Sequence, residues 1–323
     1  MKTYVTKRAL LFIPTMFLVT VAVFTIMRIV PGDPALIILG EGEDGAADNL
    51  TEAKLAKLRA KLGTDRPIYV QYGSWVGNML KGDLGDSYFY EGKPQVTFYL
   101  KDRIPTTVEL ALMSLVLASV VAVPLGVLSA IKQDSVSDYA ARIITLLGIA
   151  LPNFWVAVMT IFFLVLIFEW APPLAYEKVW NDPWTNFQQL IFPAIALGTS
   201  NMAFIARITR SAMLEVLRED YIRTARSKGL AERVIVYRHA LRNALLPVVT
   251  LFGFELGRLI SGTVIIETIF LVPGMGKLLI DSIGNRDFPM IQAVVLMIAL
   301  TVLVMNLLAD LLYAWLDPRI RYS

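Results

Sequence analysis

Few residues of this sequence have the types and spacing that catalysis requires. It has no cysteine and one histidine, His239, which excludes a thiol nucleophile, a disulfide framework and a zinc site built from cysteine and histidine. The stretch GMGK at 274–277 is similar to the end of a phosphate-binding loop. That motif needs a glycine where Leu271 stands and a serine or threonine where Leu278 stands. We therefore expect a turn here and no ATP site.

A few polar residues interrupt long apolar stretches and are the strongest candidates for a functional role inside them. Glu255 and Arg258 are three residues apart, so they can pair on one helix face. Charges at membrane depth face a cavity or a partner, so the pair is either structural or lines a pathway. Asn153, which follows Pro152, lines a polar passage or belongs to a helix kink. Asn201 lines such a passage or makes a buried hydrogen bond. Candidate pathway residues are Asn153, Asn201, Glu255 and Arg258.

The elements that carry these residues are membrane-spanning helices. Hydrophobic residues make up 56% of the chain, and several stretches of about 20 residues contain few charges, which is the length that crosses the hydrocarbon core as a helix. Spanning segments must satisfy their own backbone hydrogen bonds. The runs are continuous and do not alternate, unlike the strands of a membrane barrel. The sequence predicts an all-α integral membrane protein.

Six apolar runs define the expected organisation. The basic start precedes a first run without a small-residue cleavage site, so we interpret it as a retained span. We expect an N-terminal helix over 1–30, an extracytoplasmic excursion over 31–104 and a five-helix core over 105–323. The predicted spans, the third interrupted at Pro152-Asn153, cover about 9–30, 107–131, 140–168, 190–207, 244–266 and 290–312.

The distribution of lysine and arginine predicts the orientation. Both termini, the short loop at Lys132 and a strip over 207–242 fall on one face, and the short loops of the other face carry few cations. Cytoplasmic loops are enriched in cations, whereas long excursions are exempt from this bias. We therefore expect cytoplasmic termini. The cations of the strip are Arg207, Arg210, Arg218, Arg223, Arg226, Lys228, Arg233, Arg238 and Arg242.

The basic strip has the pattern of two helices joined by a turn. Gly229 follows the first, where a left-handed helix stop favours glycine. The strip is either a loop that fixes topology and touches anionic lipid or a docking element for a cytoplasmic partner. Helical faces are expected at Leu214, Leu217, Tyr221 and Ala225, and then at Val234, Tyr237, Leu241 and Leu245.

The strip carries a family resemblance. The sequence DYIRTARSKGLAERVIVYRHALRNALLPVVT resembles the cytoplasmic coupling loop of ABC importer permeases, in the form found in the peptide/nickel branch. Arg223, Thr224 and Ala225 occupy the places of the Glu-Ala-Ala pattern, and Gly229 occupies its glycine. The later Ile-x-Leu-Pro of that pattern falls on HALR at 239–242, where only the leucine matches.

Further blocks resemble the same branch in the same order along nearly the whole chain. They include FIPTMFLVTVAVFTIMRIVPGDPA, KGDLGDS, RIPTTVELAL, IIETIFLVPGMGKLLIDSIGNRDFPMIQ and NLLADLLYAWLDPRIRY. The resemblance is to the first of the two permease subunits of dipeptide and oligopeptide importers. It implies a type I ABC importer permease fold with six transmembrane helices and an extracytoplasmic insertion after the first.

The resemblance also implies partners and a location. These are a second homologous permease, two cytoplasmic ABC ATPase subunits that bind ATP and Mg, an extracytoplasmic solute-binding protein and the lipid of a prokaryotic plasma membrane. It implies no cofactor in this chain, no catalytic role and no nucleic acid. The expected ATPase contacts are Tyr221, Arg223, Thr224, Ala225, Arg226, Gly229 and Leu230.

Two other function classes remain as alternatives. A secondary transporter or channel without an ATPase would show internal repeats and intramembrane acids for ion coupling, and no convincing repeat is present. An intramembrane enzyme would need more catalytic groups than one histidine and no paired acids in a span. The expected solute is a dipeptide or oligopeptide, with nickel complexes, glutathione-like peptides, opines and oligosaccharides as alternatives.

Overall fold

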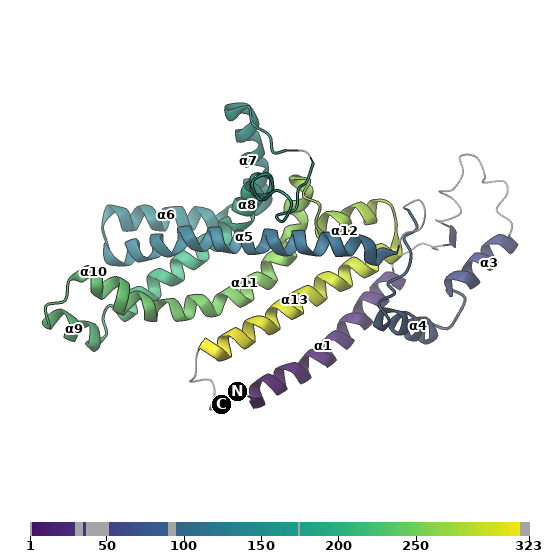
Figure 1. The fold of residues 1–323 in the computed structure, drawn as a ribbon, viewed down its shortest axis with the longest axis horizontal. Helices are drawn as coiled ribbons and strands as arrows, with labels where there is room; N and C mark the ends of the chain where they lie inside the picture. Colours follow the sequence, from purple (N-terminus) through teal and green to yellow (C-terminus); the bar gives the residue numbers. More distant parts are fainter. Residues whose placement is uncertain (1, 30–34, 37–51, 90–94, 174, 317–323) are drawn as a thin grey trace.

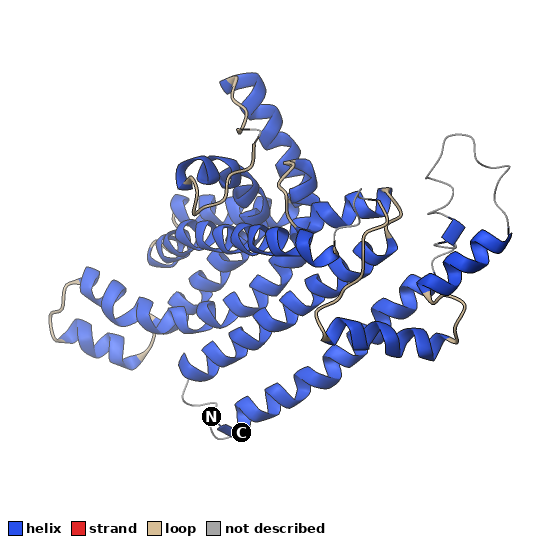
Figure 2. Ribbon diagram, turned by 45° about the vertical axis from the view of Figure 1, so that its right-hand side comes forward, coloured by secondary structure: helices blue, strands red, loops and turns tan. Residues whose placement is uncertain are grey.

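The computed structural model describes residues 2–29, 35–36, 52–89, 95–173 and 175–316. Among these residues, helices make up the fold and the only extended pairing is an isolated bridge between Asp86 and Gln95 (Figure 2). The helices are α1 Lys2–Ile29, α3 Glu52–Leu62, α4 Ile68–Leu80, α5 Val96–Ile131, α6 Val136–Ala150, α7 Asn153–Phe168, α8 Pro183–Val216, α9 Asp220–Ser227, α10 Glu232–Val234, the π-helix η2 Ile235–Ala240, α11 Leu241–Ile269, α12 Met275–Gly284 and α13 Phe288–Leu316.

The described helices confirm an all-α protein that crosses a membrane several times. Four of them are long and apolar enough to span, and the number rises to six when each of two bent helix pairs counts as one span. In one pair, α6 and α7 meet at 104°. Leu151, at the junction, has an extended backbone with φ −82° and ψ 126°, because the ring of Pro152 disfavours helical geometry in the residue before it.

Two helices are longer than the predicted spans within them. Helix α5 begins at Val96, so the predicted boundary at residue 104 falls inside it. Helix α8 begins at Pro183, a residue suited to the first helical position. Asp182 caps that helix by accepting hydrogen bonds from the N–H groups of Trp184 and Thr185, at 3.1 and 3.2 Å. The predicted spans start later because polar residues separate the first turns from the long apolar stretches: Lys101, Asp102 and Arg103 in α5, and Asn186, Gln188 and Gln189 in α8.

Helices α5 and α8 form the centre of the fold and approach each other closely. A Cβ added to Gly126 would lie 2.6 Å from the backbone oxygen of Ala206, and one added to Gly198 would lie 3.0 Å from that of Ser114. Glycine permits this backbone contact, as is common where membrane helices pack. The main buried cluster surrounds the pair and includes Leu110, Leu190, Leu197, Ile205, Val248 and Ile260.

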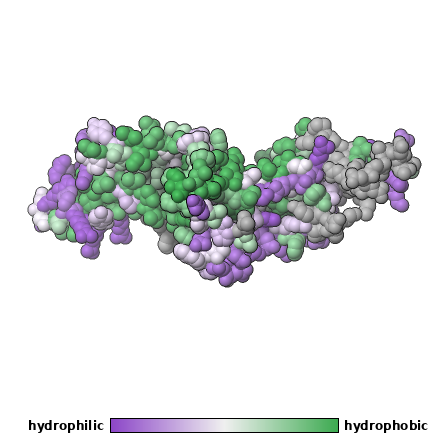
Figure 3. Space-filling model, turned by 90° about the horizontal axis from the view of Figure 1, so that it is seen from above, coloured by the Kyte–Doolittle hydropathy of each residue, from purple (hydrophilic) through white to green (hydrophobic). Residues whose placement is uncertain are grey.

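The outer surface of the helices is apolar along much of its length. Figure 3 shows hydrophobic side chains over the middle of the molecule and hydrophilic ones gathered at the end where α9 and α10 lie. Large hydrophobic side chains such as Ile13, Ile143 and Phe162 are exposed on α1, α6 and α7. An exposed apolar surface of this extent fits contact with lipid or with other membrane helices.

The excursion after α1 is attached to the core at several points. The Tyr72 hydroxyl on α4 lies 2.8 Å from Thr20 Oγ1 on α1, and Tyr72 and Trp75 pack against the ring of Phe24. Ser87 Oγ donates a buried hydrogen bond to the carboxylate of Asp287. Figure 1 shows α1 beside α13, with α3 and α4 at the end of the molecule opposite α9. The described part of the excursion is thus a folded cap.

Candidate functional site

The turn after α9 is a Schellman motif, in which left-handed backbone closes the helix. Gly229 has φ +76°, a conformation that L side chains adopt at a cost. The Gly229 N–H donates to the Arg226 carbonyl at 2.9 Å, and the Leu230 N–H donates to the Ala225 carbonyl at 3.4 Å. A Cβ added to Gly229 would meet nothing within 4 Å. The glycine is therefore required by backbone geometry and not by crowding within this chain.

One face of α9 is anchored to the core and the other is open. Ile222 and Ala225 are buried against side chains from α5, α8 and η2, including Met213 and Ile235. Ala225 therefore packs inward, although the family pattern placed it among the docking residues. The other six predicted contact residues are exposed together on the outer face: Tyr221, Arg223, Thr224, Arg226, Gly229 and Leu230.

Polar contacts hold α9 in position relative to the helices that follow. Arg226 forms an ion pair with Glu232 across the turn, at 2.7 Å, and the hydrogen bond from this pair raises the pKa of Arg226. Asn243 Nδ2 donates to the Tyr221 hydroxyl at 2.8 Å. The side chain of Arg223 is 77% exposed, and its ion pair with Asp220, at 3.4 Å, is also exposed. Arg226 thus stabilises the turn, and Arg223 presents its charge to the outside.

The predicted continuous helical face from Leu214 to Ala225 is wrong. Helix α8 ends at Val216 and α9 begins at Asp220, with Glu219 in extended backbone between them. The bend folds Ile222 back against Met213, and burial of such a side chain is favoured by about 2 kcal/mol. A straight helix would have left Ile222 in solvent, so tertiary packing overrides the local pattern.

A π-helix at Ile235–Ala240 precedes α11 and was not predicted from the sequence. Such segments are rare and often occur at functional sites. His239 is half-buried within it, and Ile235, Val236 and Ala240 are buried in the cluster that also holds Ile222. The extra residue per turn rotates this segment so that three apolar side chains face α9 and α8.

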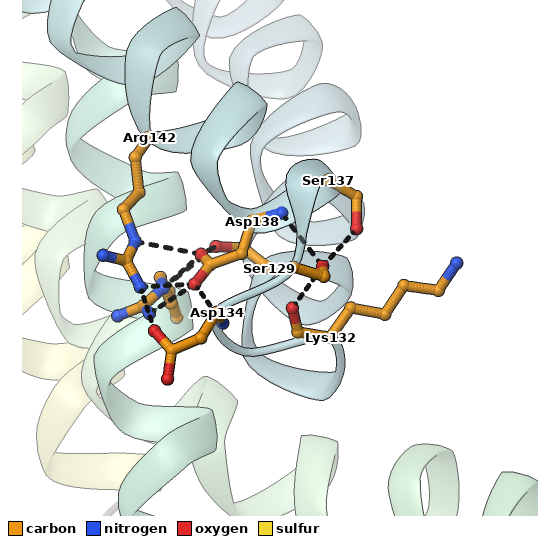
Figure 4. Close-up of polar contacts among 8 residues, drawn as sticks. Ser129, Lys132, Asp134, Ser137, Asp138 and Arg142 are labelled. Carbon is orange, nitrogen blue, oxygen red and sulfur yellow. Dashed lines mark hydrogen bonds and ion pairs between the residues drawn. The ribbon is translucent and has the colours of Figure 1, made fainter.

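Sequence reasoning also missed a buried carboxylate close to this site. Asp138 on α6 has a side chain that is 0% exposed and receives hydrogen bonds from three helices (Figure 4). Arg210 on α8 donates to both of its oxygens at 2.9 Å. Arg142 on α6, Ser129 on α5 and the backbone N–H of Asp134 also donate to it. The carboxylate therefore ties α5, α6 and α8 together at the end of the molecule that carries α9.

A local signal for Asp138 was present in the sequence. Ser135 and Asp138 have the spacing of a helix capping box, in which the first side chain accepts a hydrogen bond from the backbone of the second. The structure shows this bond, from the Asp138 N–H to Ser135 Oγ at 3.4 Å. The cap could have been predicted, whereas the contact with Arg210 joins residues 72 positions apart and depends on the fold.

Three of the four candidate pathway residues lie together. Arg258 on α11 pairs with Glu255 at 2.8 Å and also donates to the side-chain oxygen of Asn201 on α8. Asn201 and Glu255 are buried, but the Arg258 side chain is 61% exposed. Asn153 lies apart and donates to the Leu197 carbonyl at 3.3 Å, one helical turn from Asn201. The cluster presents one guanidinium at the surface of this subunit.

The GMGK stretch forms the start of α12, and the side chain of Glu267 lies against it. Glu267 accepts hydrogen bonds from Thr107 Oγ1 at 2.7 Å and from the Lys277 N–H at 3.0 Å. A Cβ added to Gly274 would lie 2.3 Å from this side chain, so the carboxyl group of Glu267 occupies the space that a phosphate would need. Within the described part of the chain, no cluster of three or more histidine and acidic side chains could hold a metal ion.

Comparisons with known families and sequences agree along the whole chain. Residues 122–322 match the family described as binding-protein-dependent transport system inner membrane component, and residues 1–111 match its N-terminal companion. The oligopeptide transport system permease protein AppB of Bacillus subtilis is 41% identical. The di/tripeptide transport system permease protein DppB of Pseudomonas aeruginosa is 39% identical. Each alignment covers 100% of both chains.

Solved structures support the fold. The methionine ABC transporter MetNI, in inward-facing conformations, aligns with a TM-score of 0.55 at 18% identity, covering 68% of this chain and 97% of that one. An amino acid ABC transporter aligns with a TM-score of 0.50 at 14% identity, covering 67% and 94%. The all-α architecture and the family expected from the sequence are thereby confirmed. The chain belongs to the family of inner-membrane components of binding-protein-dependent transport systems and has the fold of an ABC importer permease.

Proposed function

We propose that this chain forms half of the translocation pathway of an ATP-driven importer of dipeptides or oligopeptides. Its partners are a second homologous permease, two cytoplasmic ATPase subunits that bind ATP and Mg, and an extracytoplasmic solute-binding protein. The open face of α9 carries this proposal, because its inner face is fixed to the core while Arg223 and Leu230 are exposed. A rigid, exposed short helix is suited to docking in a groove of a partner.

The geometry suggests how movement of the ATPases reaches the membrane helices. Ile222 and Ala225 join α9 to the cluster formed with α5, α8 and η2. Asp138 joins α5, α6 and α8 immediately beyond this cluster. A displacement of α9 is therefore passed to several helices at once as a movement of a packed unit. In this mechanism ATP binding draws the two ATPases together, and the spans change from inward-facing to outward-facing.

Peptides are the proposed solute because the curated relatives carry that description. The matched proteins are named for oligopeptide, dipeptide and di/tripeptide transport. Nickel complexes, glutathione-like peptides and oligosaccharides are the alternative solutes. The proposal places the termini and α9 in the cytoplasm, and the start of α1 and the end of α13 both point toward the end that carries α9 (Figure 1).

Uptake by the complete transporter in proteoliposomes tests this function. We expect labelled dipeptide or oligopeptide to accumulate only when the binding protein is present on one side and ATP on the other. Accumulation driven by an ion gradient without ATP would instead establish a secondary transporter. ATP-dependent uptake of a nickel complex or oligosaccharide in place of peptide would overturn the solute and leave the permease role intact.

Reversing the charge of Arg226 tests whether its ion pair with Glu232 stabilises the turn after α9. We expect Arg226→Glu to lower peptide-stimulated ATP hydrolysis about twofold to fivefold, because an exposed ion pair contributes up to about 1 kcal/mol. The double variant Arg226→Glu/Glu232→Arg restores the pair and should recover most of the activity. If the double variant were as impaired as the single one, Arg226 would contact the partner and would not act through Glu232.

Neutralising the Glu255–Arg258 pair tests the proposed pathway role. We expect Glu255→Gln/Arg258→Gln to lower peptide uptake about tenfold, because the free energy of one charge-assisted hydrogen bond corresponds to about that factor. The amount of protein in the membrane should stay near normal, since removing both partners leaves no unpaired buried charge. Uptake and membrane abundance are measured in the same vesicles. Unchanged uptake would assign the pair a purely structural role.

A further inference from the structure

Two adjoining hollows lie at the end of the molecule opposite α9. The first has a volume of about 510 Å³ and lies among α1, α3, α4, the segment before α5 and the start of α13. The second is a groove of about 360 Å³ among α1, α12 and α13. Met27 and Phe288 line both. The two hollows therefore form one continuous site, polar at one end and apolar at the other.

The polar hollow is cationic. Arg28 and Arg66 line it, and Asp83 supplies the one carboxylate among its described lining residues. Arginine is suited to phosphate because its planar guanidinium offers two parallel N–H donors. An anionic group of phosphate size would be attracted here and would be held by several donors.

Amide side chains also line the hollow. Gln71 and Gln292 are among its lining residues. An amide can both donate and accept hydrogen bonds, which suits a headgroup that carries a phosphate and free hydroxyls.

The adjoining groove is almost wholly apolar. Its walls are formed by Val23, Ile26, Leu279, Ile283, Ile291 and Val295, with Arg286 as its one charged residue. It runs between α1 and α13, two helices apolar enough to span the membrane. An acyl chain in this groove would lie along the spans, as chains of neighbouring lipids do, while its headgroup reached the polar hollow.

We propose that an anionic phospholipid binds in this continuous site, with its phosphate among the arginines and an acyl chain in the groove. Charge complementarity selects the headgroup, and the shared residues Met27 and Phe288 connect it to the chain. The bound lipid links α1 and the excursion helices to α12 and α13. Free phosphate or a peptide would leave the groove empty, and a neutral lipid would bring no net negative charge to Arg28 and Arg66.

Native mass spectrometry of the purified transporter tests the proposal. After delipidation, phosphatidylglycerol is added and its retention is compared with that of phosphatidylethanolamine. We expect phosphatidylglycerol to be retained about tenfold better, and Arg28→Gln/Arg66→Gln to abolish the preference. Lys54→Gln/Lys57→Gln is the matched control, because these two lysines are exposed on α3 and lie outside the hollow. The control should keep the preference.

A second variant probes the groove without touching the core. Ile26 is 59% exposed on α1, so Ile26→Trp fills the groove while the fold is kept, and retention should again fall about tenfold. Equal retention of the two lipids, or equal loss in the lysine control, would overturn the proposal. Effective competition by inorganic phosphate would overturn it too. So would photo-crosslinking from position 26 to the second permease, which would make the groove a protein interface.

Discussion

Asp138→Asn lowers the midpoint of thermal unfolding of the purified transporter by about 6–12 °C. The carboxylate is fully buried and neutralises Arg210 and Arg142. Removing one partner of a buried ion pair leaves an uncompensated charge and costs about 3 kcal/mol or more, and each kcal/mol corresponds to about 2–4 °C in a chain of this size. The measurement is a thermal unfolding curve in detergent, together with the amount of protein in the membrane.

Asp134→Asn is the matched control for this effect. Asp134 also pairs with Arg142, at 3.3 Å, but its side chain is 66% exposed. Exposed pairs contribute up to about 1 kcal/mol, so we expect a shift of at most about 2–4 °C. Equal shifts in the two variants would show that Asp138 does not act through burial, and that the junction of α5, α6 and α8 is held by other contacts.

Gly229→Val lowers both peptide-stimulated ATP hydrolysis and peptide uptake while the chain stays in the membrane. A β-branched residue in left-handed backbone costs about 1–2 kcal/mol. The strain opens the Schellman turn and displaces α9 from its packed position. We expect peptide-stimulated hydrolysis and uptake to fall about tenfold. Both are measured with the reconstituted transporter, and quantitative blotting of membranes shows whether the protein is retained.

Gly229→Asn separates backbone strain from loss of space. Asparagine adopts left-handed backbone readily, and a Cβ at this position meets no atom of this chain within 4 Å. We expect at least half of the wild-type activity if strain is the cause. An asparagine variant as inactive as the valine variant would show that the partner itself packs against the glycine, which would be a different reason for the same requirement.

The apolar spans could be predicted because their signal is local. The length and composition of each apolar run are enough to identify it as a span. The basic strip is identified by its turn glycine and by its family pattern. The 104° angle between α6 and α7 could not be predicted, since Pro152 marks a break without setting its direction. The start of α5 could not be predicted either, because Lys101, Asp102 and Arg103 separate its first turn from the apolar run that hydropathy detects.

Part of the candidate site could also be predicted from the sequence, and part of it depends on the fold. Gly229 and the exposed residues around it follow from sequence, whereas the inward direction of Ala225 depends on the bend between α8 and α9. The contact between Asp138 and Arg210 joins two helices that no local pattern relates. The pairing of Arg258 with Glu255 follows from helical spacing, but its second contact, with Asn201, required the packing of α8 against α11.

Crosslinking from α9 tests the central claim most directly. The chain has no cysteine, so Ser227→Cys introduces a single thiol on the exposed face of α9. Native membranes are treated with a short thiol-to-amine crosslinker and the captured protein is identified by mass spectrometry. Lys57→Cys, at the opposite end, is the control. The account predicts capture of an ABC ATPase from position 227 and not from position 57. No capture from position 227, with its thiol shown to be accessible, would contradict it and favour a transporter that works without an ATPase.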